Sequence, residues 1–471
     1  MSLCLCGYRG HGRPPGLGYL LQGELVVRNR GESRGGDPGT RPAGLSRRAF
    51  IGAGAVAGLS AAGLTFRGLA RPAFAAQPSA VAPFGPVQVA PDDGSYARAV
   101  RLSTAKQGQP RPVLATYQRF ASAPFPLYRS DDNGQTWVQQ GNIVPPGSPA
   151  GIYLQPYLYE LPRAFASLPK GALLFACNFW PFDFTKPFPF ASTNIQLYAS
   201  TNAGLTWSLM STVAQGGPPD TTNGATPVWE PFLLLHENKL ICYYSDQRDP
   251  NYGQKLAHQV STDLVTWGPV VNDATGTIYP QRPGMTTIAQ LRGDLWIMTY
   301  EFGDPVNGDT SNYTFHVHYR LATNPESFGS SADIPLVDQN GNWPNASPTV
   351  SWSDSGGSNG TIIVTGNDEQ NLFINRALGD PGQWTQVSSP IPAGYSRQTI
   401  PIDDPAEQRD DLVLIVTGAQ YGKRGDVEAG IIALGESTKA TPGQTGNTPG
   451  QDRHAFIASA AAYVIAHRSD Y

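Results

Sequence analysis

The sequence predicts an all-β protein folded as a six-bladed β-propeller, and three observations carry this prediction. Ninety-four Gly and Pro residues among 471 interrupt the chain too often for long helices. A turn motif that ends in an aromatic residue recurs at nearly regular intervals along the chain. Between the copies lie six pairs of apolar segments, each with the composition of a β-hairpin. A β-sandwich with the same repeat is the alternative fold.

The composition fits a folded chain with a large core. The sequence is 40% hydrophobic, with 9 Trp, 20 Tyr and 19 Phe, and only 15% of its residues are charged. Disordered chains have the opposite composition. Ten of the 33 basic residues lie within residues 1–75, so the remainder carries 23 basic and 34 acidic residues. We therefore expect neither nucleic acid nor an anionic membrane as a partner, because both bind basic surfaces.

Residues 1–75 have the features of an extension followed by an export signal. Arg47 and Arg48 precede a weakly apolar Gly/Ala-rich run that ends in the small-residue pattern Ala73-Phe74-Ala75. This order resembles a twin-arginine signal peptide, which predicts cleavage near Ala75 and secretion. A membrane anchor is the alternative, but the run is short for a span of about 20 apolar residues. After cleavage we expect no attachment to a membrane.

The rest of the chain divides into two segments by composition. Residues 76–435 carry the repeats and form the predicted propeller, which we expect to be a monomer. Residues 436–471 are at first rich in Gly, Pro and Thr and then in Ala, which is typical of a polar linker followed by a tail. The fold and the function therefore have to be sought in residues 76–435.

The turn motif has two clear copies. The segment YRSDDNGQTW ends at Trp137, and YASTNAGLTW ends at Trp207. A third copy, VSTDLVTW, is one residue shorter and ends at Trp267. Weaker echoes end at Phe328 and Trp384. The spacing predicts one copy in each of five blades, with none in the sixth.

The residue types in the motif are those that a tight hairpin turn requires. Asp132 or Asn202 can close the turn by accepting hydrogen bonds from backbone amides, while Gly takes the left-handed conformation. The Trp then packs back under the turn. The motif resembles the Asp-box, also called the bacterial neuraminidase repeat, which implies a sialidase-like propeller. Its role is structural, so we assign no chemistry to it.

Six hairpins of apolar strands follow the same period. Their first strands begin near residues 98, 157, 230, 284, 347 and 397. One such hairpin in each blade would form the inner half of a six-bladed propeller. The last blade needs further strands, and we expect residues 427–434 to supply one and residues 86–91 to close the ring from the N-terminal side.

Antiparallel hairpins predict where the functional residues lie. The start of the first strand and the end of the second share one edge, so these positions from all six blades should surround one mouth of the central channel. The residues that meet this condition are Arg98, Gln118, Gln155, Tyr157, Asn178, Glu230, Asp246, Arg248, Arg282, Glu301, Ser347, Asn367, Tyr395 and Arg397.

Carboxylates are scarce in this set, and two of them suit acid–base chemistry. Glu230 follows Trp229 at the rim of an apolar strand, and Glu301 ends another such strand. In an apolar setting one carboxyl group can stay protonated while its neighbour is charged. Such a pair on adjacent blades predicts a glycoside hydrolase. The alternative is that each carboxylate only anchors a loop or pairs with Arg248 or Arg282.

Four segments resemble motifs of a known enzyme family. VWEPF, YYSDQRDP, RPGMTT and MTYE are similar to those of the exo-arabinanase family of six-bladed propeller glycoside hydrolases, and the resemblance covers most of residues 90–435. It implies a retaining enzyme that releases arabinobiose from the non-reducing end of 1,5-α-L-arabinan. It also implies that Glu230 is the general acid/base and Glu301 the nucleophile.

The remaining mouth residues and two Trp residues would contact the oligo- or polysaccharide substrate. We expect hydroxyl contacts, and ring stacking by the Trp residues, from Arg98, Tyr157, Trp229, Asp246, Arg248, Arg282, Trp343, Tyr395 and Arg397. This expectation follows from their predicted position and not from individual matches to the family.

Two other functions stay open at this point. A sialidase is one, because Arg98, Arg282 and Arg397 could clamp a carboxylate. Against it, the segment around the first arginine reads YARAVRL and lacks the FRIP-type motif of sialidases. The other is a non-catalytic carbohydrate-binding or scaffolding propeller, which would keep the turn motifs without needing two neighbouring glutamates.

The sequence predicts no metal site and no cofactor. Cys177 and Cys242 lie in apolar runs that are typical of buried free thiols, with a disulfide between neighbouring strands as the alternative. His316 and His318 alternate along a strand, as structural or sugar-contacting residues would. Glycoside hydrolysis by two carboxyl groups requires no metal and no organic cofactor.

Overall fold

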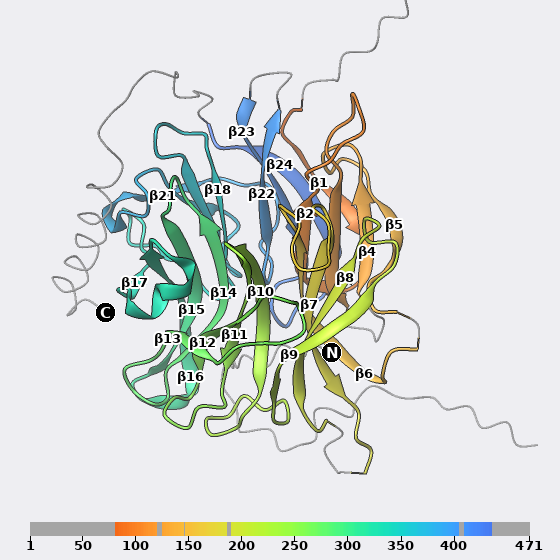
Figure 1. Cartoon of the computed structure of the whole chain (residues 1–471). Coiled ribbons are helices and arrows are strands. Elements are labelled where there is room, and N and C mark those ends of the chain that lie inside the picture. Colours follow the sequence, from red (N-terminus) through yellow and green to blue (C-terminus); the bar gives the residue numbers. More distant parts are fainter. Residues whose placement is uncertain (1–80, 120–124, 146, 186–189, 405–408, 436–471) are drawn as a thin grey trace, which may run out of the picture. The chain divides into compact units, whose positions relative to one another are not determined.

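Six four-stranded antiparallel sheets form the part of the chain that the structure describes (Figure 1). The structure is a computed structural model, and it describes residues 81–119, 125–145, 147–185, 190–404 and 409–435. The predicted signal within residues 1–75 and the tail after residue 435 lie outside them. The described helices are two short 3-10 turns, η2 (Pro325–Ser330) and η3 (Pro381–Gln383), so the all-β prediction is confirmed. No helix in these residues has the length and hydrophobicity to cross a membrane.

Each sheet is one blade, and its strands are given from the innermost outward. Blade one holds β2 (Gly94–Arg101), β3 (Val113–Arg119), β4 (Pro126–Ser130) and β5 (Val138–Asn142). Blade two holds β6 (Gly151–Glu160), β7 (Leu173–Pro181), β8 (Thr193–Ser200) and β9 (Ser208–Gly216). Blade three holds β10 (Val228–His236), β11 (Lys239–Asp246), β12 (Lys255–Ser261) and β13 (Val271–Ala274).

The second half of the ring repeats this order. Blade four holds β14 (Arg282–Gln290), β15 (Trp296–Val306), β16 (Asp309–Ala322) and β17 (Ile334–Pro335). Blade five holds β18 (Thr349–Ser353), β19 (Thr361–Thr365), β20 (Leu372–Asn375) and β21 (Trp384–Val387). Blade six holds β22 (Gln398–Asp404), β23 (Arg409–Thr417), β24 (Val427–Ala433) and β1 (Phe84–Ala90).

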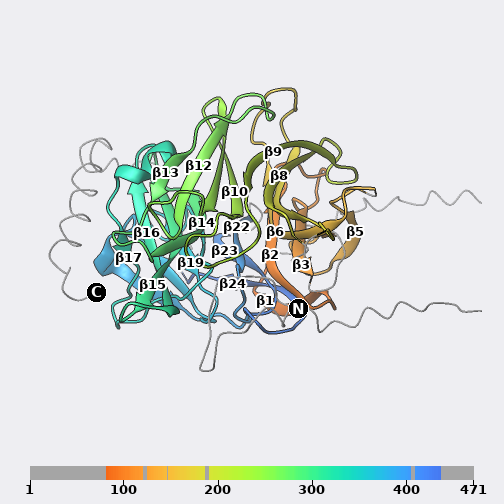
Figure 2. The ribbon, with the colours of Figure 1, turned by 90° about the horizontal axis from the view of Figure 1, so that it is seen from below.

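The innermost strands contact one another around a closed ring. The order of contacts is β2, β6, β10, β14, β18, β22 and back to β2. Figure 2 shows β2, β6, β10, β14 and β22 near the centre of the view, with outer strands such as β5, β13 and β17 towards its edges. The six-bladed propeller is therefore confirmed, and its axis is lined by the first strand of each predicted hairpin.

The ring closes by pairing the two ends of the propeller. Strand β1 pairs antiparallel with β24, with Val87 opposite Ala429 and Gln88 opposite Glu428. The two strands lie side by side in Figure 1 although they come from opposite ends of the propeller sequence. Both strands that the sequence predicted for the sixth blade are thus confirmed, with bounds shifted by one or two residues.

The hydrophobic core consists of six layers, each between two neighbouring blades. The layer between blades two and three, for example, joins Ala176 and Leu197 to Leu233 and Cys242. Middle strands such as β11 are buried at nearly every residue because a neighbouring sheet covers each face. Within the described residues Cys177 and Cys242 are both buried free thiols, as their apolar runs predicted.

The first turn motif joins β4 to β5 and is closed by hydrogen bonds from its polar residues. Asp132 accepts hydrogen bonds from the Ser130 hydroxyl (2.7 Å) and the Thr136 amide (2.9 Å). Gly134 has a left-handed φ of 91°, and its carbonyl accepts a hydrogen bond from the Trp137 indole nitrogen at 2.9 Å. The predicted structural role of the motif in a hairpin turn is confirmed.

The third copy keeps the same acidic residue but uses its Trp differently. Asp263 accepts hydrogen bonds from the amides of Thr266 (2.7 Å) and Val265 (2.8 Å). The indole of Trp267 donates to the hydroxyl of Ser211 in blade two at 3.0 Å. This copy therefore ties two blades together as well as closing its own turn.

We expect the Asp263 carboxylate to make the free energy of unfolding depend on pH in the acidic range. The backbone amides of Thr266 and Val265 lower the pKa of Asp263 to about 2. Because the unfolded chain binds this proton more readily, the stabilisation is complete above pH about 4 and is lost as the pH falls towards 2. Urea unfolding at pH 7 and at pH 2.5 should show a smaller acid-induced loss for Asp263→Asn than for the wild type. An equal loss in the two proteins would contradict this role.

We also expect ring closure to depend on burial of β1. Val89 is buried between blades six and one. A carboxylate at that position would be desolvated without a partner, at a cost of several kcal/mol. Val89→Asp should lower the melting temperature sharply, whereas Gln88→Thr at the neighbouring exposed position should change it little. A melting temperature unaffected by Val89→Asp would show that the closing strand contributes nothing.

Candidate active site

One edge of the inner hairpins carries most of the residues predicted at the mouth. The register places Leu154 opposite Asn178, Val228 opposite Asp246, and Gly284 opposite Glu301. Since the innermost strands form a ring, these positions from successive blades face the same end of the propeller axis. The hairpin geometry expected from the sequence is therefore present.

Each blade has a left-handed residue at this edge that is not Gly. These six residues are Tyr96, Gln155, Glu230, Met285, Ser347 and Ser396, with φ between 42° and 62°. In blades one to four the residue lies where the pairing register of the inner hairpin shifts, as in a β-bulge. Left-handed backbone is costly for such residues, so the surrounding contacts have to hold it in place.

The contacts that hold these residues form a ring of hydrogen bonds between blades. The amide of each left-handed residue donates to an acceptor in the preceding blade. Around the ring the pairs are Gln155 N to Gln118 Oε1 (3.1 Å), Glu230 N to Gln155 Oε1 (3.0 Å), Met285 N to Glu230 Oε2 (3.0 Å), Ser347 N to Glu301 Oε2 (2.8 Å), Ser396 N to Ser347 Oγ (3.1 Å) and Tyr96 N to Tyr395 O (3.1 Å).

Glu230 takes part in this ring through both its backbone and its side chain. Its carboxylate oxygen Oε2 accepts hydrogen bonds from the Ser245 hydroxyl (2.7 Å) and the Met285 amide (3.0 Å). The side chain is 3% exposed. A Cβ atom on Gly284 would lie 3.6 Å from Oε2, an ordinary contact distance, so this carboxylate lies directly beside Gly284.

Glu301 lies on β15, the strand that pairs with β14. It pairs with Gly284 across β14 and β15, and its Oε2 accepts the amide of Ser347 from blade five at 2.8 Å. Gly284 is thus the shared neighbour of both glutamates: Glu301 is its cross-strand partner, and Glu230 faces its Cα. The fold thus places both glutamates, which lie far apart in the sequence, next to Gly284.

The Glu230 carboxylate contacts polar groups, which corrects one expectation from the sequence. The sequence placed this carboxyl group in an apolar setting formed by Trp229. The Trp229 side chain instead packs against Trp180, with ring centres 5.8 Å apart, and its indole nitrogen donates to Gln247 Oε1 at 2.8 Å. The bulge at Glu230 is the physical reason, since it breaks the alternation of side chains along β10.

Arg98 and Tyr157 lie in the electrostatic environment of Glu230. The Arg98 guanidinium donates to the Ser396 carbonyl at 2.7 Å and sits over the ring of Tyr96. Burial lowers the pKa of Arg98, while interactions with Tyr96, Tyr157 and Glu230 raise it. Arg98 therefore brings a buried positive charge close to the Glu230 carboxylate.

Asp246 and Arg248 are paired with each other. The Arg248 guanidinium donates to both oxygens of Asp246, at 2.8 Å and 2.9 Å. Arg282 donates to the side-chain oxygens of Asn223, Gln247 and Gln254, at 2.8 to 2.9 Å. Both arginines thus have strong partners of their own at the same edge of the propeller.

Tyr395 bridges two blades across the propeller axis. Its hydroxyl donates to the Met285 sulfur at 2.9 Å, and its ring meets Tyr96 edge to face. Because Tyr96 belongs to blade one, Met285 to blade four and Tyr395 to blade six, these side chains narrow the channel at the level of the hydrogen-bond ring.

Arg397 does not lie where the sequence predicted it. The side chain is fully buried, and its guanidinium donates to the carbonyls of residues 369–371, 391 and 392. These loops enclose it within the wall of the propeller. Its predicted contact with a sugar, and its part in a three-arginine carboxylate clamp, have no support in this geometry.

Trp343 lies outside this ring of mouth residues. It is 38% exposed in the segment between β17 and β18, and its ring stacks on His316 with centres 3.9 Å apart. His318, two residues further on, instead contacts Asp333 at 3.0 Å. Among the described residues no group of three or more His, Cys, Asp or Glu side chains could hold a metal ion.

Two positioning residues were missed from the sequence. Ser245 and Met285 hold the Glu230 carboxylate, but neither was in the predicted set at the mouth. Ser245 could have been found by counting the hairpin register, because it pairs with Trp229 next to Glu230. Met285 had no such signal, because its contribution is a backbone amide.

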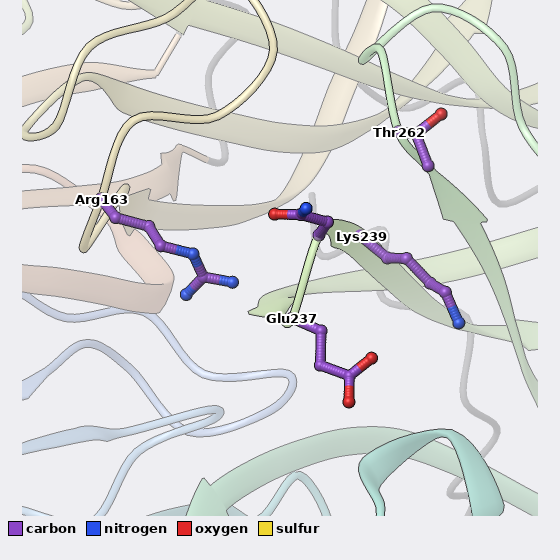
Figure 3. A pocket seen from close by; sticks show the side chains of 5 residues that line it. Arg163, Glu237, Lys239 and Thr262 are labelled. Atoms are coloured by element: carbon purple, nitrogen blue, oxygen red, sulfur yellow. The ribbon is translucent and has the colours of Figure 1, made fainter.

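An open pocket of about 480 Å³ lies at the opposite end of the inner hairpins, at the turn between β10 and β11. Arg163, Glu237, Asn238, Lys239 and Thr262 line it. Figure 3 shows the Arg163 side chain extending toward Glu237, whereas the side chains of Lys239 and Thr262 point away from Arg163. Lys239 is already paired with Glu326 at 2.9 Å. With a single carboxylate, Glu237, among its lining residues, this pocket offers no pair of carboxyl groups, so the glutamate pair at the mouth remains the candidate.

Comparisons with solved structures identify close relatives. An α-L-arabinofuranosidase from Fusarium graminearum, solved with an iminosugar inhibitor, is 37% identical over 76% of this chain and 99% of its own, with a TM-score of 0.67. The same family 93 enzyme has also been solved with arabinobiose and matches at 36% identity. An α-L-arabinanase from Penicillium chrysogenum complexed with arabinobiose is 36% identical over 76% of this chain and all of its own, with a TM-score of 0.68.

Neither the protein-family models nor the curated protein sequences give a match. The structural relatives suffice, because their identity exceeds one third and they are covered over practically their whole length. The shared six-bladed fold and the family motifs around Glu230 and Glu301 agree with them. The chain therefore belongs to glycoside hydrolase family 93, the exo-arabinanase family that its sequence motifs resemble.

Proposed function

We propose that this protein is a retaining glycoside hydrolase that removes arabinobiose from the non-reducing end of 1,5-α-L-arabinan. The observation that carries the proposal is the pair of buried glutamates that both neighbour Gly284, in a chain 36% identical to enzymes solved with arabinobiose. A retaining glycosidase needs two carboxyl groups about 5–5.5 Å apart, and a shared neighbouring residue suits such a separation.

In the first step Glu301 acts as the nucleophile. Its carboxylate attacks the anomeric carbon, and the bond from that carbon to the glycosidic oxygen breaks. Glu230 gives its proton to the departing oxygen, so the shortened chain leaves as an alcohol. The Ser347 amide holds Glu301 Oε2, which fixes the direction from which the carboxylate approaches.

In the second step Glu230, now a carboxylate, takes a proton from water. The water oxygen attacks the anomeric carbon, the ester bond to Glu301 breaks, and Glu301 leaves as a carboxylate. Two donors already occupy Glu230 Oε2, so the transferred proton would be carried by Oε1. This assignment of roles rests on the family resemblance, since both glutamates are held by a backbone amide.

Two further parts of the proposal concern the setting in which the enzyme acts. We propose that the twin-arginine pattern at Arg47 and Arg48 exports the protein and that it works as a secreted monomer on an oligo- or polysaccharide. A polymer too large to enter a cell has to be cut outside it, which is consistent with export.

The sialidase alternative loses its main support. It depended on a clamp formed by Arg98, Arg282 and Arg397, but Arg397 is enclosed by backbone carbonyls. A purely binding propeller would need neither glutamate, although both also serve the fold through the hydrogen-bond ring. Activity measurements therefore have to separate the chemical role of the glutamates from their structural one.

We expect the two glutamates to differ in the substrates that their variants still cleave. Glu301→Gln should abolish hydrolysis of all arabinosides, because no nucleophile is left. Glu230→Gln should lower kcat on arabinan by about 10²- to 10⁴-fold yet retain the first step on an aryl arabinoside whose leaving group needs no proton, seen as a rapid burst of nitrophenol followed by slow turnover, because the base of the second step is lost as well. Gln can still accept the ring hydrogen bonds, so both variants should fold. Reducing-end release and nitrophenol release measure the two activities.

The matched control is Glu237→Gln, which changes an exposed glutamate at the far end of the same hairpin. It should leave both activities unchanged. Full arabinan hydrolysis by either active-site variant would refute the assignment, and so would a wild type that releases no sugar from arabinan.

We expect Gly284 to be essential for the geometry of the pair. A Cβ there would lie 2.7 Å from Gln254 Nε2, 3.4 Å from Ser245 Oγ and 3.6 Å from Glu230 Oε2. Gly284→Ala should therefore displace the Gln254 amide group, which donates to the Pro283 carbonyl and accepts from Arg282 beside the pair, and lower kcat by about 10- to 100-fold, because small misplacements near reacting groups are costly. Gly141→Ala, whose Cβ would meet nothing within 4 Å, is the control. Unchanged kcat in Gly284→Ala would contradict the close approach.

A further inference from the structure

A second pocket lies between blades four and five, away from the two glutamates. It has a volume of about 600 Å³ and opens between β16, the segment before β18, the loop after β19, and β21. Its lining residues are His316, Gly341, Asn342, Trp343, Asn345, Glu369, Gln370, Asn371 and Gln386. Neither Glu230 nor Glu301 is among them.

The pocket opens on the same end of the propeller as the glutamates. Asn345 precedes the ring residue Ser347, whose amide binds Glu301, by only two positions. The loop that contributes Glu369 follows the end of β19, which shares its edge with the start of β18. Because β20 and β21 are the outer strands of blade five, the pocket lies further from the propeller axis than the glutamates do.

Trp343 provides a flat apolar surface in this pocket. One face of its ring is stacked on His316, with ring centres 3.9 Å apart and planes inclined by 30°. The residue is nevertheless 38% exposed. Burial, followed by the neighbouring His318, lowers the pKa of His316, so the imidazole beneath the indole is neutral at neutral pH. The indole is therefore held in position with part of its surface open to a ligand.

Polar groups that are already held in place surround the indole. Gln386 donates to Asp338 Oδ2 at 2.9 Å and accepts from the Asn371 side chain at 3.0 Å. The Glu369 carboxylate accepts the Asn345 amide at 3.1 Å. Burial raises the pKa of Glu369 to about 7, so near neutral pH this carboxyl group can donate as well as accept. Side chains fixed in this way lose little entropy when a ligand binds.

The charges in the pocket select a neutral ligand. None of the nine lining residues is Lys or Arg, and Asp338 and Asp368 lie just behind them. The Arg397 guanidinium also lies behind the lining, but it is fully buried and donates to the carbonyls of Glu369, Gln370 and Asn371. A phosphate or a carboxylate would therefore meet no positive side chain in the pocket wall. A sugar ring fits instead, because it offers an apolar face to the indole and hydroxyl groups to the surrounding amides and the carboxyl group.

We propose that this pocket is a second glycan-binding site, which holds a distant part of the same arabinan chain while its end is cleaved. The inference rests on the proposed function, and it adds a site that the two-glutamate mechanism does not require. A chain bound at both places gains apparent affinity, since the second contact becomes intramolecular. A substrate of two or three sugars is too short to benefit.

The test compares long and short substrates. Trp343→Ala should raise KM for linear arabinan about tenfold, as expected for one lost stacking contact, while kcat stays within about twofold. The rise in KM for arabinotriose should be several times smaller. Trp343→Phe, which keeps a flat ring, should restore most of the affinity for arabinan. An equal rise in KM for both substrates, a fall in kcat, or no change at all would each overturn the proposal.

Two controls separate binding from stability. Melting temperatures of the Trp343 variants should stay close to that of the wild type, because the residue is partly exposed. Phe184→Ala removes the most exposed aromatic side chain of the described residues, which lies outside the pocket, and should leave KM for arabinan unchanged. A similar rise in KM for Phe184→Ala would mean that any exposed aromatic ring contributes, and would also overturn the proposal.

A binding assay distinguishes this inference from the proposed function. Native electrophoresis through a gel that contains linear arabinan should retard the wild type and Glu301→Gln more than Trp343→Ala. If the wild type hydrolyses no arabinan but is retarded in a Trp343-dependent way, the hydrolase assignment fails and the binding site stands. If arabinan is hydrolysed but retardation is equal in all three proteins, the binding site fails alone.

Discussion

The interaction on which the rest of this propeller depends is the hydrogen bond that each blade donates to the preceding one at the mouth. Six residues other than Gly adopt left-handed backbone there, and each directs its amide at an acceptor in the neighbouring blade. A residue in that conformation persists only when its surroundings stabilise it. The acceptors of these hydrogen bonds therefore also stabilise the bulges at which the left-handed residues lie. The ring thus sets the position of every inner strand before any ligand is present.

Two acceptors in this ring are the glutamates assigned to the chemistry, and that coincidence explains how the site is preorganised. Glu230 holds Met285 of blade four, and Glu301 holds Ser347 of blade five, so the carboxyl groups are fixed by the same contacts that fix the blades. Gly284 pairs with Glu301 across the two strands, and its Cα lies beside the Glu230 carboxylate. In the sequence, a structural role and a catalytic role for these carboxylates were alternatives. The hydrogen bonds are compatible with one carboxylate serving both roles.

The sequence predicted this arrangement as far as its periodicities reach. Six apolar hairpins, spaced by the turn motifs, indicated the number of blades, and hairpin edges selected Glu230 and Glu301. The direction of side chains next to the bulges could not be predicted from the sequence, because one extra residue reverses which face of the sheet each following side chain lies on. Trp229 therefore packs against Trp180 and donates to Gln247, and Arg397, which follows the left-handed Ser396, is enclosed by backbone carbonyls of the loops around it. Contributions of backbone amides, such as that of Met285, leave no trace in residue type.

The central claim is that the ring fixes a nucleophile at Glu301 and an acid/base at Glu230. Covalent trapping tests it most directly. An arabinofuranoside with fluorine at C2 and a good leaving group should form the ester rapidly and lose it slowly, and peptide mass spectrometry then locates the sugar. The account predicts one sugar on the peptide that contains Glu301 and none on the peptide that contains Glu230. A sugar on Glu230, or turnover with inverted product and no adduct, would contradict it.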